Sequence, residues 1–486
     1  MKIVFVSPEM DPFAKTGGLA DVASTLPKEI HALGQEVFCF LPKYKKVDSR
    51  KWPLRVVIDR LKIPVGSEVE TGRVFHYEEE KGLQVYFIDQ PEYFGRDELY
   101  GTPLGDYPDN DRRFTFFQRG VLEALRKLGL QPDVIHGNDW QTGLLAAYLK
   151  TLYKEDAFFA KTKTVFTIHN LAYQGNFPPD SLPATGLGWS EFRLERLEFY
   201  GKVSFLKAGL VYADALTTVS PRYTQEIQTK EFGCGMEGIL RLRRHDLVGI
   251  VNGIDPLEWN PEKDPDLPKR FSLKKLEDKG VNKTTLQKEN HFKVDKKIPL
   301  LGIITRLVDQ KGLDLLVSAM EGFIKRDVQF VLLGTGEEKY HQVFRELGKK
   351  YPEQLGIHIV FDAKMAKRIY AGADLFLIPS RYEPCGLGQL ISFRFGTVPL
   401  VRETGGLADT VQNFDPKTGQ GNGFVFKDYE PKAFLEAVDR ALEVYSNPKL
   451  WVELVKNGMQ ADFSWRASAK QYVNLYEKVE KKPIEV

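Results

Sequence analysis

The sequence is poor in several features that would mark particular classes of protein. Its 486 residues contain three cysteines (Cys39, Cys234 and Cys385), an odd number with no C-x-x-C pair, which favours neither a disulfide framework nor a zinc knuckle. A formal net charge of +2 argues against a general nucleic-acid-binding protein. No G-x-x-x-x-G-K-[ST] sequence occurs, so a P-loop nucleotidase is excluded.

Long apolar runs are also missing. The N-terminus has one lysine and four strongly apolar residues before Ser7 and Pro8, too few for the core of a signal peptide. No later run approaches the length of a membrane span. We therefore expect a cytoplasmic protein that binds neither membrane nor nucleic acid.

What the sequence does contain is a regular alternation of short β-branched runs with helical periodicity, which predicts an α/β protein with parallel sheets. The length favours two domains. One series of predicted strands covers 3–6, 37–40, 134–135, 165–168 and 216–219, and a second covers 300–304, 330–333, 357–361, 375–378 and 398–401. Helices are predicted at about 113–128 and 316–323. A charged stretch at 259–297 separates the two series, and residues 52–90 have the pattern of an antiparallel insertion.

One six-residue segment, TGGLAD, occurs twice, at 16–21 and at 404–409. In its first copy, Lys15, Gly17 and Gly18 follow a predicted strand and open a predicted helix. Glycines there let backbone N–H groups approach a ligand, and a helix N-terminus favours an anion. A plain tight turn with a surface lysine explains the first copy equally well. Two domains that each contribute such a turn to one ligand explain the repeat better than chance.

Two further turns point to the same kind of site. Arg306 and Lys311, in TRLVDQKG, follow a predicted strand, where open α/β sheets bind their ligands. Glu383, in SRYEPCGLG, follows another predicted strand and precedes a glycine-rich helix start. A solvated loop and an exposed turn glutamate are the alternatives for these two segments.

Other motifs favour structural explanations. GCGMEG at 233–238 matches G-x-G-x-x-G, but a predicted helix precedes it instead of a strand, so a flexible loop is favoured over a dinucleotide site. Asp109-Asn110-Asp111 resembles a metal-binding D-x-D, but its place before a helix favours N-capping. Since no His/carboxylate cluster has metal-ligand spacing, we predict no metal and no cofactor.

Over the whole chain, eight motifs resemble those of bacterial glycogen synthases and plant starch synthases and occur in the same order. They are KTGGLADV, HGNDWQTG, FTIHNLAYQG, FGCGMEGILRLR, VNGIDPLEWNP, TRLVDQKG, SRYEPCGLGQL and ETGGLADTV. The resemblance implies a GT-B fold, with two facing Rossmann-like domains around a deep cleft. It divides the chain into an N-terminal domain (1–250), a nucleotide-sugar domain (251–463) and a C-terminal helix (464–486) that returns to the first domain.

The resemblance implies transfer of glucose from ADP-glucose to the non-reducing end of an α-1,4-glucan, with retention of configuration. UDP-glucose stays open as the donor, and so does the oligomeric state. The implied catalytic residues are His169, Arg306, Lys311 and Glu383. The implied substrate-binding residues are Lys15, Gly17, Gly18, Asp21, Tyr100, Asp139, Asn252, Cys385, Gly386, Leu387, Thr404, Gly405 and Gly406.

The sequence departs from the family pattern at two places. Gly388 stands where the family usually has threonine, and Ile391 stands where many relatives of the same fold have a second glutamate. The ribose contact is therefore unassigned. A nucleotide-sugar epimerase, a pyridoxal-phosphate-dependent glucan phosphorylase, an inactive glucan-binding scaffold and a dehydrogenase are the competing functions.

Overall fold

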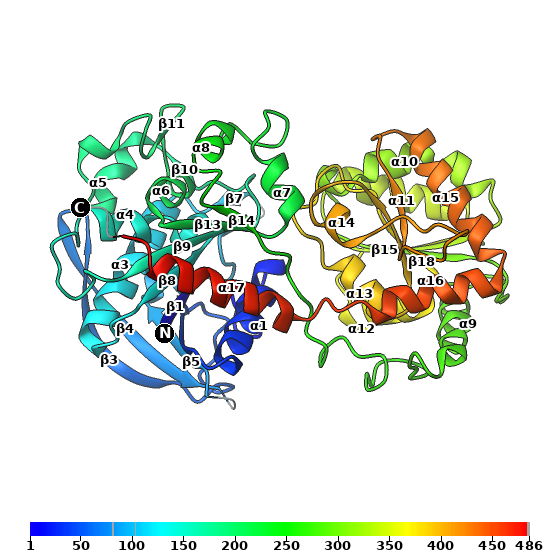
Figure 1. The fold of residues 1–486 in the computed structure, drawn as a ribbon, viewed down its shortest axis with the longest axis horizontal. Helices are drawn as coiled ribbons and strands as arrows, with labels where there is room; N and C mark the ends of the chain where they lie inside the picture. The colour runs from blue at the N-terminus through cyan, green and yellow to red at the C-terminus, as the bar shows by residue number, and fades with distance from the viewer. Residues whose placement is uncertain (80–81, 103, 484–486) are drawn as a thin grey trace. The chain divides into compact units, whose positions relative to one another are not determined.

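The chain forms two compact units, each discontinuous in sequence (Figure 1). The computed structural model describes residues 1–79, 82–102 and 104–483. The first unit contains Met1–Val219, Thr224–Ile250 and the segment from Trp465, and the second contains Ser220–Tyr223 and Val251–Ser464. Residues 80–81 of the predicted insertion and 484–486 of the predicted C-terminal segment lie outside the described residues.

A nine-stranded sheet is the centre of the first unit. Its strand order is β14-β13-β9-β8-β1-β2-β5-β4-β3. Neighbouring strands from β14 to β5 are parallel, whereas β4 pairs antiparallel with β5 and β3 pairs antiparallel with β4 at the edge of the sheet. The strands are β1 (Lys2–Val6), β2 (Glu36–Pro42), β3 (Arg55–Val65), β4 (Glu68–Glu78), β5 (Gln84–Asp89), β8 (Val134–Asn138), β9 (Lys163–Ile168), β13 (Ala215–Thr218) and β14 (Leu247–Gly249). β3, β4 and β5 lie within residues 52–90, where the sequence predicts an antiparallel insertion; β5 also pairs with β2 in parallel.

Helices and two small sheets complete the first unit. The helices are α1 (Gly18–Ala32), α2 (Pro91–Phe94), α3 (Asn110–Leu128), α4 (Leu144–Lys150), α5 (Leu182–Thr185), α6 (Phe205–Tyr212), α8 (Glu237–Leu242) and α17 (Trp465–Glu480), while α7 (Pro221–Glu226) begins in the second unit. The small antiparallel sheets are β6 (Gly101–Thr102) with β7 (Gly105–Asp106), and β10 (Asn176–Phe177) and β11 (Glu198–Phe199) on either side of β12 (Lys202–Ser204).

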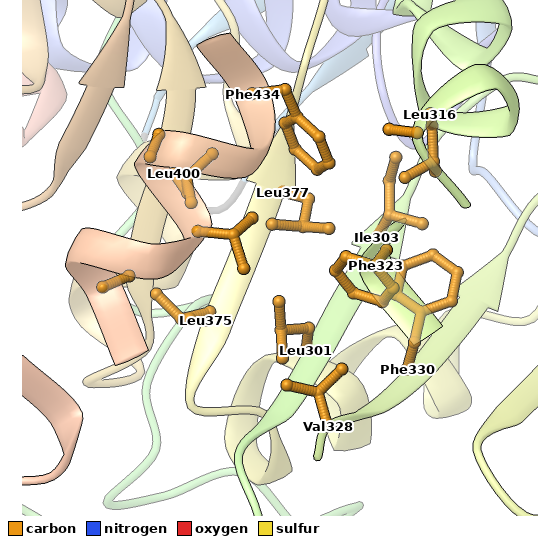
Figure 2. Packing of buried hydrophobic residues seen from close by; sticks show 14 of the residues in the cluster. Leu301, Ile303, Leu316, Phe323, Val328, Phe330, Leu375, Leu377, Leu400 and Phe434 are labelled. Carbon is orange, nitrogen blue, oxygen red and sulfur yellow. The ribbon is translucent and has the colours of Figure 1, made fainter. Parts of the chain in front are cut away.

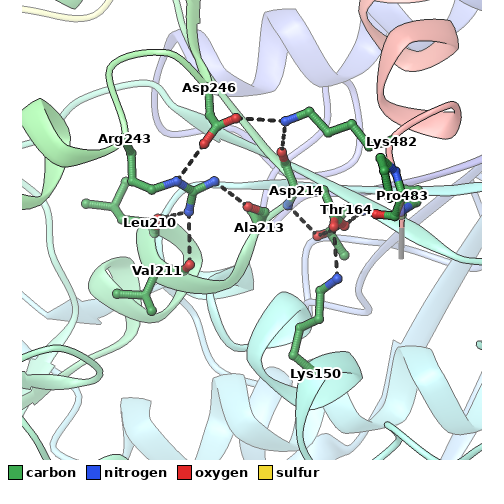
Figure 3. A network of polar contacts seen from close by, with 11 residues as sticks. Lys150, Thr164, Leu210, Val211, Ala213, Asp214, Arg243, Asp246, Lys482 and Pro483 are labelled. Atoms are coloured by element: carbon green, nitrogen blue, oxygen red, sulfur yellow. Dashed lines mark hydrogen bonds and ion pairs between the residues drawn. The ribbon is translucent and has the colours of Figure 1, made fainter. Parts of the chain in front are cut away.

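The last helix, α17, is part of the first unit and packs against α1 (Figure 1). Its apolar face, with Tyr472, Leu475, Tyr476 and Val479, is buried. Beyond it, the Lys482 ammonium donates to the Asp214 carbonyl and to the Asp246 carboxylate, both at 2.7 Å, and Lys163 donates to the Pro483 carbonyl at 3.1 Å (Figure 3). These polar contacts attach Lys482 and Pro483 to β9 and to the turns before β13 and β14.

The second unit is built on a six-stranded parallel sheet in the order β17-β16-β15-β18-β19-β20. In chain order this is 3-2-1-4-5-6, the usual Rossmann arrangement, with a switch point between β15 and β18. The strands are β15 (Leu300–Ile304), β16 (Gln329–Leu333), β17 (Leu355–His358), β18 (Leu375–Ile378), β19 (Val398–Arg402) and β20 (Phe424–Phe426). The parallel part of the first sheet has the same kind of switch point, between β1 and β8.

Alternating residues of the central strands form the core of the second unit. Because side chains alternate across a strand, Leu301 and Ile303 of β15 share one face of the sheet. There they meet Phe323 of α10 (Leu313–Ile324) and Phe434 of α15 (Pro431–Tyr445) (Figure 2). The other helices are α9 (Lys279–Glu289), α11 (Glu338–Lys350), α12 (Ala363–Gly372), α13 (Gly388–Arg394), α14 (Gly405–Thr410) and α16 (Pro448–Gln460).

One predicted strand is displaced. The sequence predicts a strand at 357–361, whereas β17 covers Leu355–His358. Its pairing with β16 ends at Leu333 and His358, because β16 itself ends there. Val360 and Phe361 beyond it are 48% and 86% exposed, so their apolar character does not reflect burial in a sheet.

The charged stretch at 259–297 is an ordered part of the second unit. It contains α9, whose Lys283 is 4% exposed and pairs with Asp374 at 2.6 Å. Lys283 also donates to the Tyr445 hydroxyl at 2.7 Å and to the Lys296 carbonyl at 2.8 Å. The positive charge of this segment therefore includes a cation that is bound inside the unit.

Replacing Lys283 with an uncharged residue should destabilise the protein. In a Lys283→Met variant the buried Asp374 carboxylate keeps the Leu300 N–H as a donor but loses its counter-ion. We expect the free energy of unfolding to fall by about 2 kcal/mol. Denaturant titration of the variant, with the exposed Lys288→Met on the same helix as the matched control, measures this. Equal stability of the two variants would contradict the role of Lys283.

No helix in the described part of the chain is both long enough and apolar enough to cross a membrane.

Candidate functional site

The first cluster of predicted site residues surrounds Glu9, a residue that the sequence analysis missed. Glu9 follows β1 and is 4% exposed. Its carboxylate accepts hydrogen bonds from the Thr16 N–H at 2.6 Å, the Thr16 hydroxyl at 2.5 Å, the Gly17 N–H at 3.3 Å and the Tyr100 hydroxyl at 2.7 Å. In the turn that the sequence suggests for an anion, the N–H groups of Thr16 and Gly17 thus already donate to a carboxylate of the protein itself.

The remaining groups of this turn are arranged around α1. Lys15 forms an ion pair with Asp21, in the first turn of α1. Burial raises the pKa of Asp21, and the Lys15 ammonium acts in the opposite direction. Gly17 is extended (φ −156°), and no described neighbour lies within 4 Å of the position that a Cβ there would take. The protein's own packing does not require a glycine at 17, and the open space is available to a ligand.

Asp139 and His169 meet at the carboxyl ends of β8 and β9. The His169 N–H donates to the Asp139 carboxylate at 2.7 Å, and Asp139 has φ 56° and ψ 178°. This backbone conformation is strained for a residue other than glycine, and such strain gathers at functional sites. The loops after β1, β8 and β9 therefore bring Glu9, Asp139 and His169 to one edge of the sheet, next to its switch point.

The two ionisable side chains of this pair are both shifted toward neutrality. Burial, together with the nearby Glu9 carboxylate, raises the pKa of Asp139 to about 7, although the N–H groups of His169 and Asn170 act in the opposite direction. Loss of hydration lowers the pKa of His169 to about 3. The imidazole is consequently neutral at physiological pH, whereas Asp139 changes charge within the physiological range.

The raised pKa of Asp139 makes stability depend on pH. Between its ordinary value of 3.8 and about 7 the folded protein binds more protons at this carboxyl than the unfolded chain, so stability falls as the pH rises. Asp139→Asn removes this dependence. We expect its stability relative to the wild type to improve by roughly 2 kcal/mol between pH 5 and pH 8. Urea titrations of both proteins at the two pH values test this, and a constant difference would contradict the shift.

In the second unit, Lys311 and Glu383 form a short ion pair. The Lys311 ammonium lies 2.6 Å from the Glu383 carboxylate, and the Ser380 hydroxyl donates to the same oxygen at 3.0 Å. Lys311 follows β15 and Glu383 follows β18, the two strands at the switch point of this sheet. The alternative of an exposed turn glutamate does not hold, because Glu383 is 7% exposed.

Arg306 differs from its neighbour Lys311. It lies in the same loop after β15 and is exposed. Within the part of the chain that the structure describes, its guanidinium has no hydrogen-bond or ion-pair partner. A cation that faces solvent at the carboxyl edge of a parallel sheet is available to an anionic ligand.

The second TGGLAD copy packs behind the Glu383 turn. Gly405 has φ 44°, and a Cβ there would lie 1.9 Å from the Glu383 carbonyl oxygen; a Cβ on Gly406 would lie 2.2 Å from that of Cys385. Only glycine permits this approach, so these two glycines support the turn that carries Glu383. Thr404 is the N-cap residue of α14, and Asp409 accepts a hydrogen bond from Ser220.

Cys385 and Asn252 adjoin the same turn. Burial raises the pKa of the Cys385 thiol to about 12, although the Asn252 N–H lowers it, so the sulfur is neutral. Gly386 has φ 73°, and Leu387 is the N-cap residue of α13. Asn252 is 6% exposed, and its Oδ1 has no hydrogen-bond partner among the described residues. A buried acceptor of this kind suits a donor group on a ligand.

Two motifs for which the sequence favours a structural explanation, Asp109-Asn110-Asp111 and GCGMEG, can be compared with the structure. Asp109 is the N-cap residue of α3, but its side chain does not cap the helix: both carboxylate oxygens accept from the Arg96 guanidinium, at 2.7 and 2.5 Å. That corrects the predicted side-chain capping. GCGMEG follows α7 and extends into the first turn of α8, outside any strand. Among the described residues no group of three or more His, Cys, Asp or Glu side chains has the arrangement of a metal site.

Comparison with known sequences gives the family. The profile described as "Starch synthase catalytic domain" matches residues 2–242, and that of "Glycosyl transferases group 1" matches residues 284–460. The glycogen synthase of Syntrophotalea carbinolica is 49% identical over 480 residues, which cover 98% of this chain and 99% of that protein. This chain belongs to the glycogen synthase family.

Other members of the glycogen synthase family agree over the full length. The glycogen synthase of Thermosipho melanesiensis is 46% identical over 486 residues, with both chains covered completely. Among solved structures, the catalytic domain of starch synthase IV from Arabidopsis thaliana, bound to ADP and acarbose, superimposes with a TM-score of 0.91 at 35% identity and covers 99% of each chain. The predicted GT-B fold with two Rossmann-like domains and the predicted glycogen or starch synthase activity are confirmed. The protein is a glycosyltransferase that uses a nucleotide-sugar donor and a glucan acceptor.

Proposed function

We propose that this glycogen synthase transfers glucose from ADP-glucose to the non-reducing end of an α-1,4-glucan with retention of configuration. The observation that carries the proposal is the ion pair between Lys311 and Glu383 at the β15/β18 switch point, with the exposed Arg306 in the same loop as Lys311. The ADP bound to the starch synthase IV domain supports adenine as the base, and the acarbose bound there supports an oligosaccharide acceptor.

In this proposal the second unit binds the donor. Arg306 and Lys311 interact with the diphosphate, whose negative charge grows as the glycosidic bond breaks, so that both cations stabilise the transition state more than the ground state. Glu383 holds Lys311 in place and accepts from glucose hydroxyls. The segment Cys385-Gly386-Leu387 next to it offers backbone N–H groups to the same sugar, and Asn252 offers its side-chain oxygen. The residues of this group are Asn252, Glu383, Cys385, Gly386, Leu387, Thr404, Gly405 and Gly406.

The first unit contributes the groups around the transferred glucose and the acceptor. Asp139 and His169, joined by the 2.7 Å hydrogen bond, approach the glucose. Tyr100 lies on the acceptor side, where its hydroxyl is oriented by Glu9. The turn of Lys15, Gly17 and Gly18, with Asp21 beside it, lies near the phosphates of the donor. Because Glu9 already occupies two backbone N–H groups of this turn, Lys15 and the open space at Gly17 are its contribution.

Incorporation of labelled glucose into glycogen tests the proposal. We expect transfer from ADP-glucose, with no loss of activity in EDTA, because leaving-group stabilisation is assigned to Arg306 and Lys311 rather than to a metal ion. Transfer from UDP-glucose alone would contradict the donor assignment. Activity that EDTA abolishes and magnesium restores would contradict metal independence. Analysis of the anomeric configuration of the new linkage tests retention.

A further inference from the structure

Asn138, the last residue of β8, makes a set of hydrogen bonds that leaves its amide a single orientation. It is 1% exposed. Its Nδ2 donates to the Val6 carbonyl of β1 at 3.0 Å and lies 3.5 Å from the His136 carbonyl of β8. Its Oδ1 lies 2.9 Å from Nε2 of His169. The opposite orientation would turn the amide oxygen toward two carbonyl oxygens, which cannot donate to it.

This orientation determines where the proton of His169 resides. An amide oxygen only accepts hydrogen bonds, so the Nε2 that lies 2.9 Å away must carry the hydrogen. The neutral ring then has an unprotonated Nδ1 with a lone pair. Val6 and His136 belong to adjacent paired strands, so the carbonyl groups that orient Asn138 are held by the sheet itself.

We infer that Asn138 is a positioning residue that fixes His169 in the Nε2–H tautomer, so that Nδ1 accepts a hydrogen bond from a hydroxyl of the substrate sugar. Nδ1 has no hydrogen-bond partner among the described residues. The backbone of His169 is fixed as well, by the donation of its N–H to Asp139. The lowered pKa of His169 keeps the ring neutral, which prevents a second proton from occupying Nδ1. The assignment to the sugar rests on the proposed function; the tautomer does not.

The tautomer is measured directly by NMR on the full-length protein labelled with ¹⁵N-histidine. The chain has eight histidines, and a His169→Gln variant identifies the signals of His169 by difference. We expect the wild-type protein to show a protonated Nε2 and an unprotonated Nδ1 at neutral pH. A wild-type spectrum with the proton on Nδ1 would overturn the inference without any need for a variant at 138.

Two substitutions separate the acceptor of Asn138 from its donors. Asn138→Leu removes the partner of Nε2 and should give a mixture of both tautomers. Asn138→Asp keeps an oxygen for Nε2–H and should retain the single tautomer. Asn457→Leu is the matched control, because Asn457 also donates to two backbone carbonyls, those of Gly419 and Gly421, but contacts no histidine. A single Nε2–H tautomer in a folded Asn138→Leu protein would overturn the role of Asn138.

Kinetics with donor analogues that lack one glucose hydroxyl at a time test the acceptor role of Nδ1. With the intact donor, Asn138→Leu should lower kcat/KM roughly tenfold, as expected for a misplaced hydrogen-bond partner. With the analogue that lacks the interacting hydroxyl, the variant and the wild type should become similar. An equal ratio for every analogue would overturn the sugar contact. If the wild type transferred no glucose from either nucleotide sugar, the proposed function would fail while the tautomer result would stand.

Discussion

Replacing Arg306 with alanine should lower kcat on the order of a hundredfold or more while the stability of the protein is unchanged. The guanidinium is exposed and has no partner among the described residues, so its removal breaks no contact within the fold. Its proposed partner is the diphosphate, whose charge increases toward the transition state. The loss should therefore fall mainly on kcat, with a smaller change in KM for the donor.

Steady-state kinetics and thermal unfolding of Arg306→Ala, beside Arg345→Ala, test this prediction. Arg345 is also exposed, on α11, and its only ion pair is a 3.4 Å contact with Glu338 in the described part of the chain. Normal kinetics of Arg306→Ala would remove this residue from the diphosphate site. A lower melting temperature would mean that the loop after β15 depends on it, and the kinetic result would no longer report on chemistry alone.

Replacing Lys311 with alanine should reduce kcat by a similar factor and, in contrast, also destabilise the protein. The ammonium group lies 2.6 Å from Glu383, which is left buried and charged with the Ser380 hydroxyl as its one side-chain donor among the described residues. An unpaired buried carboxylate costs about 2 kcal/mol. The structure thus predicts a loss of both activity and stability for Lys311→Ala, and for Glu383→Ala as well.

The control is Lys339→Ala, since Lys339 pairs with Asp309 in an exposed position close to the same loop. This exposed pair should contribute little to stability. Kinetics in which Lys311→Ala raises only KM would indicate equal binding of ground state and transition state, and the leaving-group role would have to be abandoned. Comparison of Lys311→Ala with Arg306→Ala separates the two effects, because only the first residue is part of an internal ion pair.

The predictions from sequence succeed where local pattern determines structure. Buried apolar runs such as 300–304 and 375–378 are strands because a strand that is buried on both faces carries few polar side chains. The same criterion misplaced β17, because apolar residues at 360 and 361 continue beyond the end of its partner strand. Strand order was not predictable, since it depends on contacts between residues far apart in the chain.

The candidate site was predictable in its residue types but not in its internal contacts. Lys311 and Glu383 each follow a strand, yet nothing near either residue indicates that they pair across 72 positions. Glu9 was missed for the same reason. Its bond with Tyr100 joins residues 91 positions apart, and the short segment Ser7-Pro8-Glu9 has no pattern that distinguishes it from an ordinary turn.

The return of α17 to the first unit has a consequence for synthesis on the ribosome. His136 of β8 is fully buried and hydrogen-bonded to the Tyr476 hydroxyl at 2.7 Å, and Tyr472 and Val479 cover neighbouring apolar surface. While the second unit is being translated, this part of the first unit has no covering helix, and its apolar side chains are exposed to solvent. The first unit therefore acquires α17 only after the second unit, which precedes this helix in the chain, has been synthesised.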